Sequence, residues 1–389
     1  MPDGDDGRIE AAVKVLSGIG EVAAAAWDAC AGSGNPFLSH AFLSALEDSG
    51  AVAADTGWLP RHMVVEDAGG RVVGAMPLYL KGHSYGEYVF DWAWADAYER
   101  AGGRYFPKLL SAVPFTPVPG SRMLVRDDAD RAAVEEILAG GLVGLVKRLG
   151  VSSAHVNFLP REQWERLGEF GLLQRTGLQY HWSNDGYADF DGFLAALSSR
   201  KRKAIRKERR EVAESGLTIR RLTGAAIEDR HWDAFFRFYT DTSDRKWGSP
   251  YLNRRFFSLL GERLSERILL VVAERDGEPV AGALNLIGDD TLYGRNWGCV
   301  EDHPFLHFEA CYYQAIEFAI ERGLAKVEAG AQGPHKLQRG YLPVETYSAH
   351  LIADPRLREA VADFLVRERR QVTRECAAMA AESPFRKDE

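Results

Sequence analysis

The chain has 389 residues, which exceeds the size of one typical hydrophobic core and predicts two domains. Apolar residues make up 46% of it and charged residues 27%, a composition that excludes disordered and fibrous proteins. The net charge of −8 excludes a molecule built as a whole to bind nucleic acid, so a polyanionic partner must meet a local basic patch.

The cysteines and the apolar runs bear on compartment and cofactors. The acidic start of the chain lacks the basic region of a signal peptide, and no apolar run approaches the roughly 20 residues that span a bilayer. We therefore expect a cytoplasmic protein with no transmembrane segment, no metal site and no tightly bound cofactor. The four cysteines show no CxxC and no metal-ligand spacing, which predicts reduced thiols: Cys30, Cys299, Cys311 and Cys376.

The first half of the chain predicts helices, a hairpin and an irregular insertion. A helix over 8–30 comes first, and a second helix begins at Ser39, which is placed to cap it. Strands at 63–65 and 72–80 flank a Gly-Gly pair, a hairpin signal. The aromatic and proline-rich insertion at 81–130 is either a covering layer or the wall of a binding site. A helix at 131–149, a strand at 153–158, a helix near 161–169 and a strand around 172–182 follow.

The second half predicts a further α/β unit. It opens with a long helix at about 191–214, which Gly216 ends. The clearest amphipathic helix covers 307–323, with Glu309 off its apolar stripe. The remaining predicted elements are a strand at 217–222, helices at 228–241 and 252–265, a hairpin of 268–275 and 279–287, strands at 291–297, 326–329 and 346–353, and a terminal helix from 354 to about 380.

The two predicted hairpins are related by an internal repeat. A shift of 208 residues matches six identities within 12 positions, from Val64 on Val272 to Ala75 on Ala283. Because the order of elements around both hairpins also matches, we predict a duplicated α/β domain. The predicted domains are 1–187, which includes the insertion, and 188–389.

A basic helix at the start of the second domain is the first candidate for chemistry. Eight of the 11 residues from 200 to 210 are Lys or Arg. Two interpretations remain open: a solvated face, or a ridge that binds the phosphates of a nucleotide sugar, CoA or tRNA. One stripe follows helical spacing i, i+3, i+4, i+7 and consists of Lys203, Arg206, Lys207 and Arg210.

The Gly-rich stretch 328–347 is the second candidate. A carboxylate or tyrosine near an amine can accept its proton, while cations and backbone N–H groups stabilise an oxyanion. Glu309 and Tyr341 are therefore the candidate proton acceptors. The candidate binding residues in this region are Arg295, Trp297, Gln332, His335, Lys336 and Arg339.

Several strings of the chain resemble a known family. The second domain resembles the tandem GNAT-fold transferases of the FemABX type, and more closely the bacterial FemAB-like proteins of peptidoglycan biosynthesis or recognition. The sequence has no long antiparallel helical arm of the kind some Fem enzymes carry. The strings that carry the resemblance are 199–210, Thr242 with Arg245 and Phe256-Phe257, 308–323, Lys336 to Tyr341 as a Lys-x-x-Lys/Arg-Gly-Phe/Tyr element, and, in the first domain, Asp91-Trp92 and 107–119.

The resemblance implies a fold and an activity. The fold would be two tandem GNAT-like α/β domains, each a mixed, mostly antiparallel sheet flanked by helices. The activity would be transfer of an aminoacyl or related acyl group from an activated donor, such as aminoacyl-tRNA, to the amine of a small molecule or peptide. Asp91 and Trp92 join the candidate substrate-binding residues on this basis. An acyl-CoA-dependent N-acyltransferase and a non-catalytic module that binds a cell-wall precursor remain alternatives, and DNA is not an expected partner.

Overall fold

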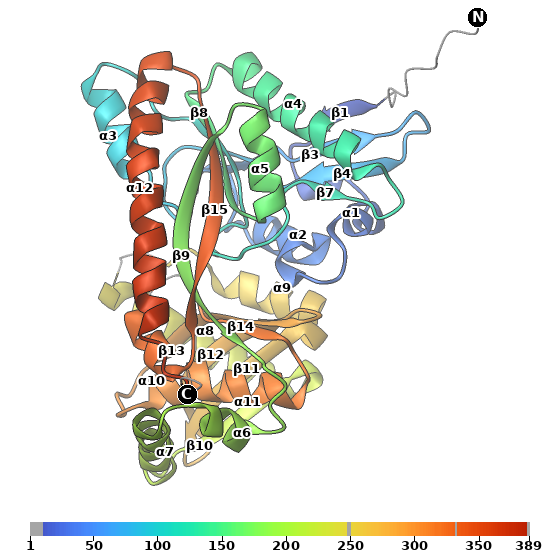
Figure 1. The fold of residues 1–389 in the computed structure, drawn as a ribbon. Coiled ribbons are helices and arrows are strands. Elements are labelled where there is room, and N and C mark those ends of the chain that lie inside the picture. The colour runs from blue at the N-terminus through green and yellow to red at the C-terminus, as the bar shows by residue number, and fades with distance from the viewer. Residues whose placement is uncertain (1–10, 247–249, 331–332, 387–389) are drawn as a thin grey trace, which may run out of the picture. The chain divides into compact units, whose positions relative to one another are not determined.

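A computed structural model describes residues 11–246, 250–330 and 333–386 of the chain (Figure 1). Its contacts group the chain into two compact units, each of which is assembled from two segments. Unit 1 comprises Met1–Gly177 and Thr346–Arg369, and unit 2 comprises Leu178–Glu345 and Arg370–Glu389. The boundary predicted at 187–188 would assign the whole later part of the chain to the second domain.

Unit 1 begins with a small antiparallel sheet. The strands lie in the order β1-β3-β4-β7, with bounds β1 (Ala12–Val15), β3 (Met63–Glu66), β4 (Val72–Met76) and β7 (Leu124–Val125). The helix predicted over 8–30 is wrong within its described part, because residues 12–15 form a strand that pairs with β3. The β-branched Val13 and Val15 favour an extended backbone, and only α1 (Ala24–Ala31) is α-helical in this range.

The other predicted helices of unit 1 are confirmed, and the cap predicted at Ser39 is present. The side chain of Ser39 accepts a hydrogen bond from the Phe42 amide at the start of α2 (His40–Asp48). At α4 (Arg131–Leu149), Asp130 caps the start and Gly150 adopts a left-handed conformation at the end. The apolar side of α4 packs on β3, β4 and β8, which forms the main core of unit 1.

A second group of strands in unit 1 follows the order β15-β8-β6-β5-β2. Its members are β2 (Trp58–Pro60), β5 (Tyr79–Lys81), β6 (Lys108–Ser111), β8 (Ser153–Leu159) and the later part of β15 (Leu342–Ile352), with α5 (Arg161–Glu169) following β8. The insertion predicted to be irregular at 81–130 contains β6, β7 and α3 (Trp92–Arg100). Its mixture of aromatic and short polar residues masked the helical period.

The sheet of unit 2 runs β10-β11-β12-β13-β14-β9. The bounds are β10 (Thr218–Thr223), β11 (Ile268–Arg275), β12 (Glu278–Ile287), β13 (Thr291–Cys299), β14 (Lys326–Glu328) and β9 (Leu173–Ser183). Neighbouring strands are antiparallel except β13 and β14, which are parallel. Strands β9 and β15 each pass from one unit into the other along the chain.

The predicted repeat is confirmed as a repeat of structure. Both β3–β4 and β11–β12 are antiparallel hairpins, and each has a register irregularity beside an equivalent glutamate, Glu66 or Glu274. A preceding strand pairs with the first strand of each hairpin, β1 in unit 1 and β10 in unit 2. A later strand pairs with the second, β7 in unit 1 and β13 in unit 2.

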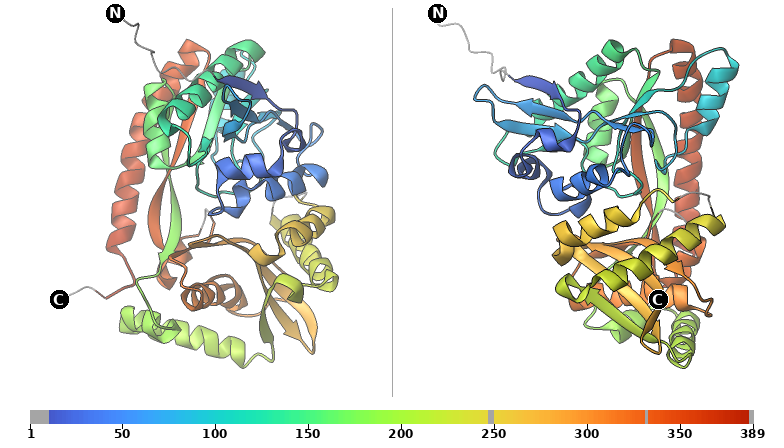
Figure 2. Two further views of the ribbon diagram at one scale, coloured as in Figure 1. Left: turned by 90° about the vertical axis from the view of Figure 1, so that its right-hand side faces the viewer. Right: turned by 180° about the vertical axis from the view of Figure 1, so that it is seen from behind.

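Helices cover both faces of the unit 2 sheet. Figure 2 shows α8 (Asp229–Lys246) and α9 (Arg254–Leu264) together against one face. The opposite face carries a helical run made of α10 (Leu306–Phe308), a π-helical turn (Glu309–Tyr313) and α11 (Gln314–Glu321).

The remaining helices of the described chain are α6 (Phe190–Ala196), α7 (Ser199–Ala213), α12 (Pro355–Ala381) and the 3₁₀ turns 19–21, 36–38, 224–226, 265–267 and Pro334–Arg339.

One long helix predicted for unit 2 is in fact two. Residues 191–214 divide into α6 and α7, because Leu197 and Ser198 adopt extended backbone conformations between them. Leu197 is fully buried and pairs with Phe385 as an isolated bridge. This tertiary contact outweighs the helical propensity of the surrounding residues. Among the described residues, no helix combines the length and apolar character needed to cross a membrane.

Close packing of α8 on the sheet gives the first prediction. A Cβ atom at Gly298 would lie 2.2 Å from the backbone oxygen of Phe238, which cannot move as a side chain could. We expect Gly298→Ala to lower the free energy of unfolding by about 2–3 kcal/mol through overpacking. Urea denaturation would measure this loss.

The matched control is Gly140→Ala on the exposed side of α4, where an added Cβ meets nothing within 4 Å. This substitution should leave stability unchanged or raise it by up to about 1 kcal/mol, because alanine favours a helix. Equal effects of the two substitutions would contradict the packing argument.

Candidate functional site

The candidate site lies where two parallel strands of unit 2 separate. Strands β13 and β14 pair only through residues 291–293 and 326–328. Beyond Tyr293 and Glu328 the two segments of the backbone diverge, and β13 continues beside β12 to Cys299. The backbone groups on the facing edges of diverging strands are therefore available to a ligand.

A β-bulge shapes the wall formed by β13. Leu284 pairs with Asn296 and Asn285 pairs with Gly294, which leaves Arg295 as the extra residue between them. Such a bulge re-aims a side chain and commonly occurs beside a functional site. Glycine at 294 permits the Asn285 side chain to lie close to the backbone of β13, since a Cβ at 294 would lie 3.2 Å from Oδ1 of Asn285.

The π-helical turn supplies the opposite wall. Extra residues in a π turn widen the helix, and such turns frequently occur at functional sites. This turn carries Cys311 and Tyr312, and His307 precedes it by two residues. The predicted helix at 307–323 is thus confirmed in position, but its first part is not a regular α-helix.

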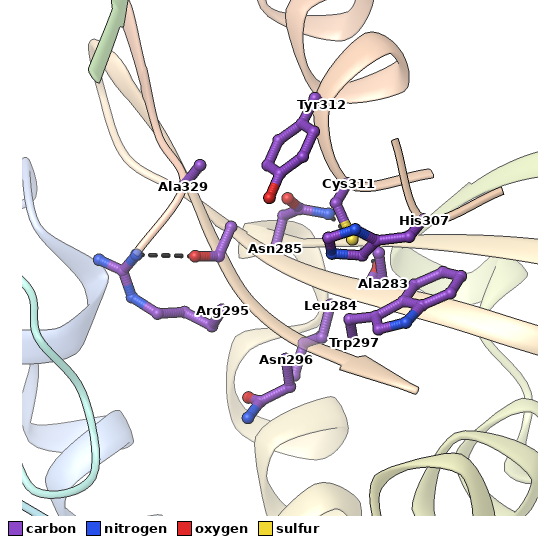
Figure 3. Close-up of a pocket in the computed structure, with 11 residues that line it drawn as sticks. Ala283, Leu284, Asn285, Arg295, Asn296, Trp297, His307, Cys311, Tyr312 and Ala329 are labelled. Carbon is purple, nitrogen blue, oxygen red and sulfur yellow. Dashed lines mark hydrogen bonds between the residues drawn. The ribbon is translucent and has the colours of Figure 1, made fainter. Parts of the chain in front are cut away.

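These walls enclose a pocket of about 80 Å³. Figure 3 shows the Tyr312 hydroxyl pointing toward Asn285, with His307 and Trp297 at one end of the pocket and Arg295 and Ala329 at the other. The His307 and Trp297 rings meet edge to face, 5.4 Å apart. The lining residues are Ala283, Leu284, Asn285, Gly294, Arg295, Asn296, Trp297, His307, Cys311, Tyr312 and Ala329.

Lys336 is bonded to the wall of this pocket. Its Nζ donates to the backbone oxygens of Ala329 at 2.6 Å and of Gly330 at 3.0 Å. The ammonium group has three N–H donors, so one has no partner among the described residues. Burial lowers the pKa of Lys336 to about 8, and the positive charge of Arg295 adds to this shift.

Arg295 and Glu328 form a buried pair at the same end. The Arg295 side chain is 5% exposed and that of Glu328 is 1% exposed, with Nη2 and Oε2 at 3.4 Å. Another guanidinium nitrogen of Arg295 donates to the Gly294 carbonyl at 2.8 Å. The pocket end that holds Ala329 therefore carries positive charge from Arg295 and Lys336, offset in part by Glu328.

Tyr312 and His335 form a second polar pair at the pocket. The Tyr312 hydroxyl lies 2.9 Å from Nε2 of His335. Burial lowers the pKa of His335, and the charges of Arg339 and Lys336 lower it further. This shift favours the neutral imidazole, which can accept a hydrogen bond from the tyrosine.

Arg339 lies behind the pocket rather than on its surface. Its guanidinium donates to both carboxylate oxygens of Glu208 on α7, at 2.9 and 3.0 Å. It also lies 3.3 Å above the Phe308 ring, a cation–π contact. The Tyr313 hydroxyl donates to the same Glu208 carboxylate. Arg339 thus anchors the 3₁₀ turn 334–339 to α7.

Glu309 is held in a similar way. Arg209 of α7 donates to both of its oxygens at 3.0–3.2 Å and also to Glu317 at 3.0 Å. The Gln314 amide donates to the same carboxylate at 2.7 Å. These bonds occupy a carboxylate whose side chain is only 5% exposed. We therefore withdraw Glu309 as a proton acceptor and assign it to the attachment of α7.

Tyr341 also loses its predicted role. It is fully buried, and its hydroxyl donates to the backbone oxygen of Tyr312 at 3.4 Å. Burial raises the pKa of Tyr341 well above its ordinary value. Its hydroxyl is fixed in the core and cannot exchange a proton with a ligand in the pocket.

The basic stripe lies on the exposed side of α7. Its four residues, Lys203, Arg206, Lys207 and Arg210, are all exposed. Arg206 pairs with exposed Asp191, and Lys207 with Glu211 on the same helix. Such pairs contribute little to stability, so the stripe remains accessible to an anion.

The other predicted residues are distributed as follows. Arg295 and Trp297 line the pocket, and His335 and Lys336 bond to the lining residues Tyr312 and Ala329. Asp91 and Trp92 belong to unit 1, and Gln332 lies outside the described residues. Within the described ranges, no group of three or more His, Cys, Asp and Glu side chains is placed to hold a metal ion.

The sequence patterns did not reveal several residues of the site. Asn285 is the single amide in an otherwise apolar stretch of β12, which is a usable signal for a polar residue facing a site. Glu208 is the single acidic residue in a run of cations. This pattern could have indicated that its carboxylate pairs with a cation elsewhere in the fold. Cys311 and Tyr312 carried no such signal, because they fit the apolar stripe of the predicted helix.

Comparisons with known proteins agree with this architecture. A family model of FemAB-like proteins, described as peptidoglycan biosynthesis/recognition, matches residues 18–387. No curated protein matches the chain.

The fold is shared with several solved structures. The crystal structure of FemX is 13% identical, with a TM-score of 0.54, and the match covers 90% of this chain and 100% of that one. The C-terminal domain of a putative lysylphosphatidylglycerol synthetase from Agrobacterium fabrum is 10% identical, with a TM-score of 0.53 and coverages of 88% and 94%. L-PGS from Bacillus licheniformis is 11% identical, with a TM-score of 0.51 and coverages of 86% and 98%. The predicted fold of two tandem GNAT-like α/β domains is confirmed.

The Arg209–Glu309 pair gives a stability prediction. Glu309→Ala would leave Arg209 partly buried with one fewer partner, and we expect a loss of about 2–4 kcal/mol in the free energy of unfolding. Lys203→Ala on the exposed stripe should change it by less than about 0.5 kcal/mol. Urea denaturation of both variants tests this difference, and a neutral Glu309→Ala would reopen a catalytic role for the carboxylate.

Proposed function

Since the chain belongs to the FemAB-like family of peptidoglycan biosynthesis/recognition proteins, we propose that it is an N-acyltransferase. It moves an aminoacyl or related acyl group from an activated donor, such as aminoacyl-tRNA, to the amine of a small molecule or peptide. The family and fold support a transferase in general. The pocket of unit 2 supports acyl transfer in particular.

One observation carries the proposal: the ammonium group of Lys336 is fixed at the pocket wall. Its bonds to Ala329, a residue of the pocket wall, and to Gly330 fix its position, and its third N–H has no partner among the described residues. When an amine attacks an ester carbonyl, negative charge develops on the carbonyl oxygen. A prepositioned cation in a site that excludes most water stabilises that charge strongly. Arg295 adds positive charge to the same end of the pocket.

Tyr312 and His335 supply a route for the proton. The attacking amine must lose a proton as the new C–N bond forms. The Tyr312 hydroxyl faces the pocket and can receive that proton while it passes its own to the neutral Nε2 of His335, 2.9 Å away. The C–O bond to the donor then breaks, and its oxygen takes the proton back from His335 through Tyr312, which restores both side chains. No metal and no covalent enzyme intermediate takes part in this scheme.

The size of the pocket is consistent with a small acyl group. Its volume of about 80 Å³ has room for several water-sized groups. Such a space suits the reacting carbonyl and a few attached atoms. The larger part of the donor must lie outside, where the exposed cations of α7 would attract phosphates.

The donor class is the first thing to establish. Purified protein would be incubated with an amine acceptor and either labelled aminoacyl-tRNA or labelled acyl-CoA. A product whose formation RNase abolishes supports the aminoacyl-tRNA donor, and an RNase-resistant, CoA-dependent product identifies acyl-CoA instead. If neither donor yields product, the transferase proposal fails.

Lys336→Met keeps the length of the side chain and removes its charge. We expect kcat/KM to fall by about 10²–10³, because that is the cost of losing one oxyanion donor. The control is Lys147→Met on the exposed side of α4, which should keep full activity. Arg339→Ala is unsuitable as a second test, because Arg339 is held in a buried ion pair with Glu208 and its loss would disturb the fold.

The pH dependence follows from the same ammonium group. The pKa of Lys336 is lowered to about 8, so the charged form is lost as pH rises through 8. We therefore expect kcat/KM to fall above about pH 8. The residual activity of Lys336→Met should lack this decline, and an identical alkaline limb in both proteins would remove Lys336 from the mechanism.

The basic stripe on α7 predicts how a tRNA donor would bind. Replacing Lys203, Arg206, Lys207 and Arg210 by glutamine should weaken tRNA binding and reduce the slope of log K against log[salt] by about 3, given ~0.7–0.9 for each phosphate that the stripe neutralises. The control is the triple substitution of Arg367, Arg370 and Arg374 by glutamine on α12. Equal losses in both variants would indicate general charge attraction and no defined ridge.

A further inference from the structure

Unit 2 contains a second pocket, which shares no lining residue with the candidate site. It lies between the start of α8, the later part of α9 and the 3₁₀ turns 224–226 and 265–267, and we call it the α8–α9 pocket. Its volume of about 300 Å³ falls at the lower end of the range of about 300–1,000 Å³ that small-molecule sites occupy. The pocket is therefore large enough for a small ligand, and its lining indicates which kind.

Two glycines leave room at the walls of this pocket. Gly261 lies inside α9, where glycine destabilises a helix relative to alanine. A Cβ atom at Gly261 would lie 2.7 Å from Nε1 of Trp232, and a Cβ atom at Gly224 would lie 2.7 Å from Oε1 of Glu266. Glycine at both positions therefore leaves the indole N–H and the Glu266 carboxylate uncovered by a neighbouring side chain.

The indole N–H of Trp232 is a buried donor that lacks a partner. Trp232 lines the pocket, is 3% exposed, and stacks on the Phe257 ring at 6.1 Å. Its Nε1 has no hydrogen-bond partner among the described residues, and yet the atom is not closed off from solvent. A buried tryptophan N–H usually finds a partner, so this donor indicates an acceptor group within the pocket.

Two carboxylates line the same pocket. Asp229 is the first residue of α8 and Glu262 lies near the end of α9, and both are exposed. Neither carboxylate has an ion pair or a side-chain hydrogen bond among the described residues. Both are therefore available to a donor that enters the pocket.

Neighbouring cations are bonded elsewhere. Arg254 donates to Oδ1 of Asp233 at 2.7 Å and to the Ser258 hydroxyl, and its remaining contact with Asp229 is to the backbone oxygen at 3.5 Å. Arg230 pairs with Glu228 at 2.7 Å.

Other arginines follow Glu262 in the sequence but are not part of the pocket. Arg267 pairs with Asp289 at 2.8 Å. Arg263 is adjacent to Glu262 on α9, where successive side chains point about 100° apart. Among the described residues, no Lys or Arg lines the pocket, so its carboxylates attract positive charge.

The two requirements together specify a ligand class. Carboxylates are satisfied by N–H or O–H donors, and an ammonium group supplies three N–H donors with a positive charge. An ammonium group has no acceptor, so it cannot satisfy the indole N–H. A hydroxyl group can, because its oxygen has two lone pairs.

We infer that the α8–α9 pocket binds the protonated form of an amino alcohol. Its ammonium group would pair with Asp229 and Glu262, and its hydroxyl group would accept the hydrogen bond of the Trp232 indole. The lining residues Ile227 and Ile268 would contact its carbon skeleton. This site goes beyond the proposed acyl transfer and does not rest on it, because the two pockets have no lining residue in common.

Calorimetric titration of the full chain with trans-4-aminocyclohexanol tests this site. Three probes share its ring: cyclohexylammonium lacks the hydroxyl, trans-1,4-cyclohexanediol lacks the charge, and trans-4-hydroxycyclohexanecarboxylate reverses the charge. No acyl donor is present, so the result is separate from any transfer activity. We expect saturable binding of the amino alcohol and about tenfold weaker binding, or less, of each other probe.

The same titrations can overturn the inference. Absence of saturable aminocyclohexanol binding would remove the site. Equal binding of the diol or of the carboxylate would show that positive charge is not recognised. Equal binding of cyclohexylammonium would show that the hydroxyl is not recognised, and each of these results contradicts the inference.

Glu262→Gln locates the ammonium group. This exposed side chain keeps its shape and loses its charge, and aminocyclohexanol binding should weaken about fivefold, the size expected for one accessible ion pair. Glu359→Gln, on the exposed side of α12, is the matched control and should bind as the wild type does. Equal affinities of the two variants would refute the proposed position.

Trp232→Phe locates the hydroxyl group. Phenylalanine keeps an aromatic ring beside Phe257 and removes the N–H. We expect aminocyclohexanol binding to weaken about fivefold while cyclohexylammonium binding stays unchanged, a difference between two probes that general damage to the fold would not produce. If both probes weaken equally, or neither does, the indole N–H has no role and the inference fails.

Discussion

The divergence of β13 and β14 is the constraint on which the unit 2 site depends. Two parallel strands that pair through only three residues each leave backbone groups unpaired, a costly arrangement unless other groups hold it open. Lys336 does so on one side by bonding the carbonyls of Ala329 and Gly330. The bulge at Arg295 does so on the other by shifting the register of β13. The same features that keep the strands apart give the pocket its charge.

Buried ion pairs on α7 serve a related purpose. Glu208 holds Arg339, and Arg209 holds Glu309, so one helix fixes both the turn that carries Lys336 and the π turn that carries Tyr312. Buried pairs of this kind contribute little net stability, since desolvation offsets much of the attraction. Their value here is geometric. They set the positions of groups that have to be placed within a fraction of an ångström.

The two units use one strand order for different purposes. Each has a central hairpin with a bulge beside a glutamate, and each hairpin lies between two further strands. In unit 2 the edge of this sheet opens into a polar pocket. In unit 1 the polar residues lie on a separate group of strands, where Lys108, Glu87 and Asp91 form a buried charge cluster. Duplication of a fold therefore did not duplicate its site.

The sequence by itself determined the tandem α/β architecture, the hairpin repeat and most helix boundaries, because periodicity and caps are local properties. It also identified Lys336 and Arg295 at the pocket. The sequence could not show that Lys203 lies on the exposed side of α7 while Glu208 and Arg209 point inward. Residues on both sides of the helix follow the same helical spacing. Tertiary structure alone decided that Glu309 and Tyr341 are buried and bonded and that Tyr312 faces the pocket with His335. It also decided that the Trp232 indole lines a pocket and has no hydrogen-bond partner among the described residues. The physical reason is that the availability of a polar group depends on partners distant in sequence, and no local pattern records them.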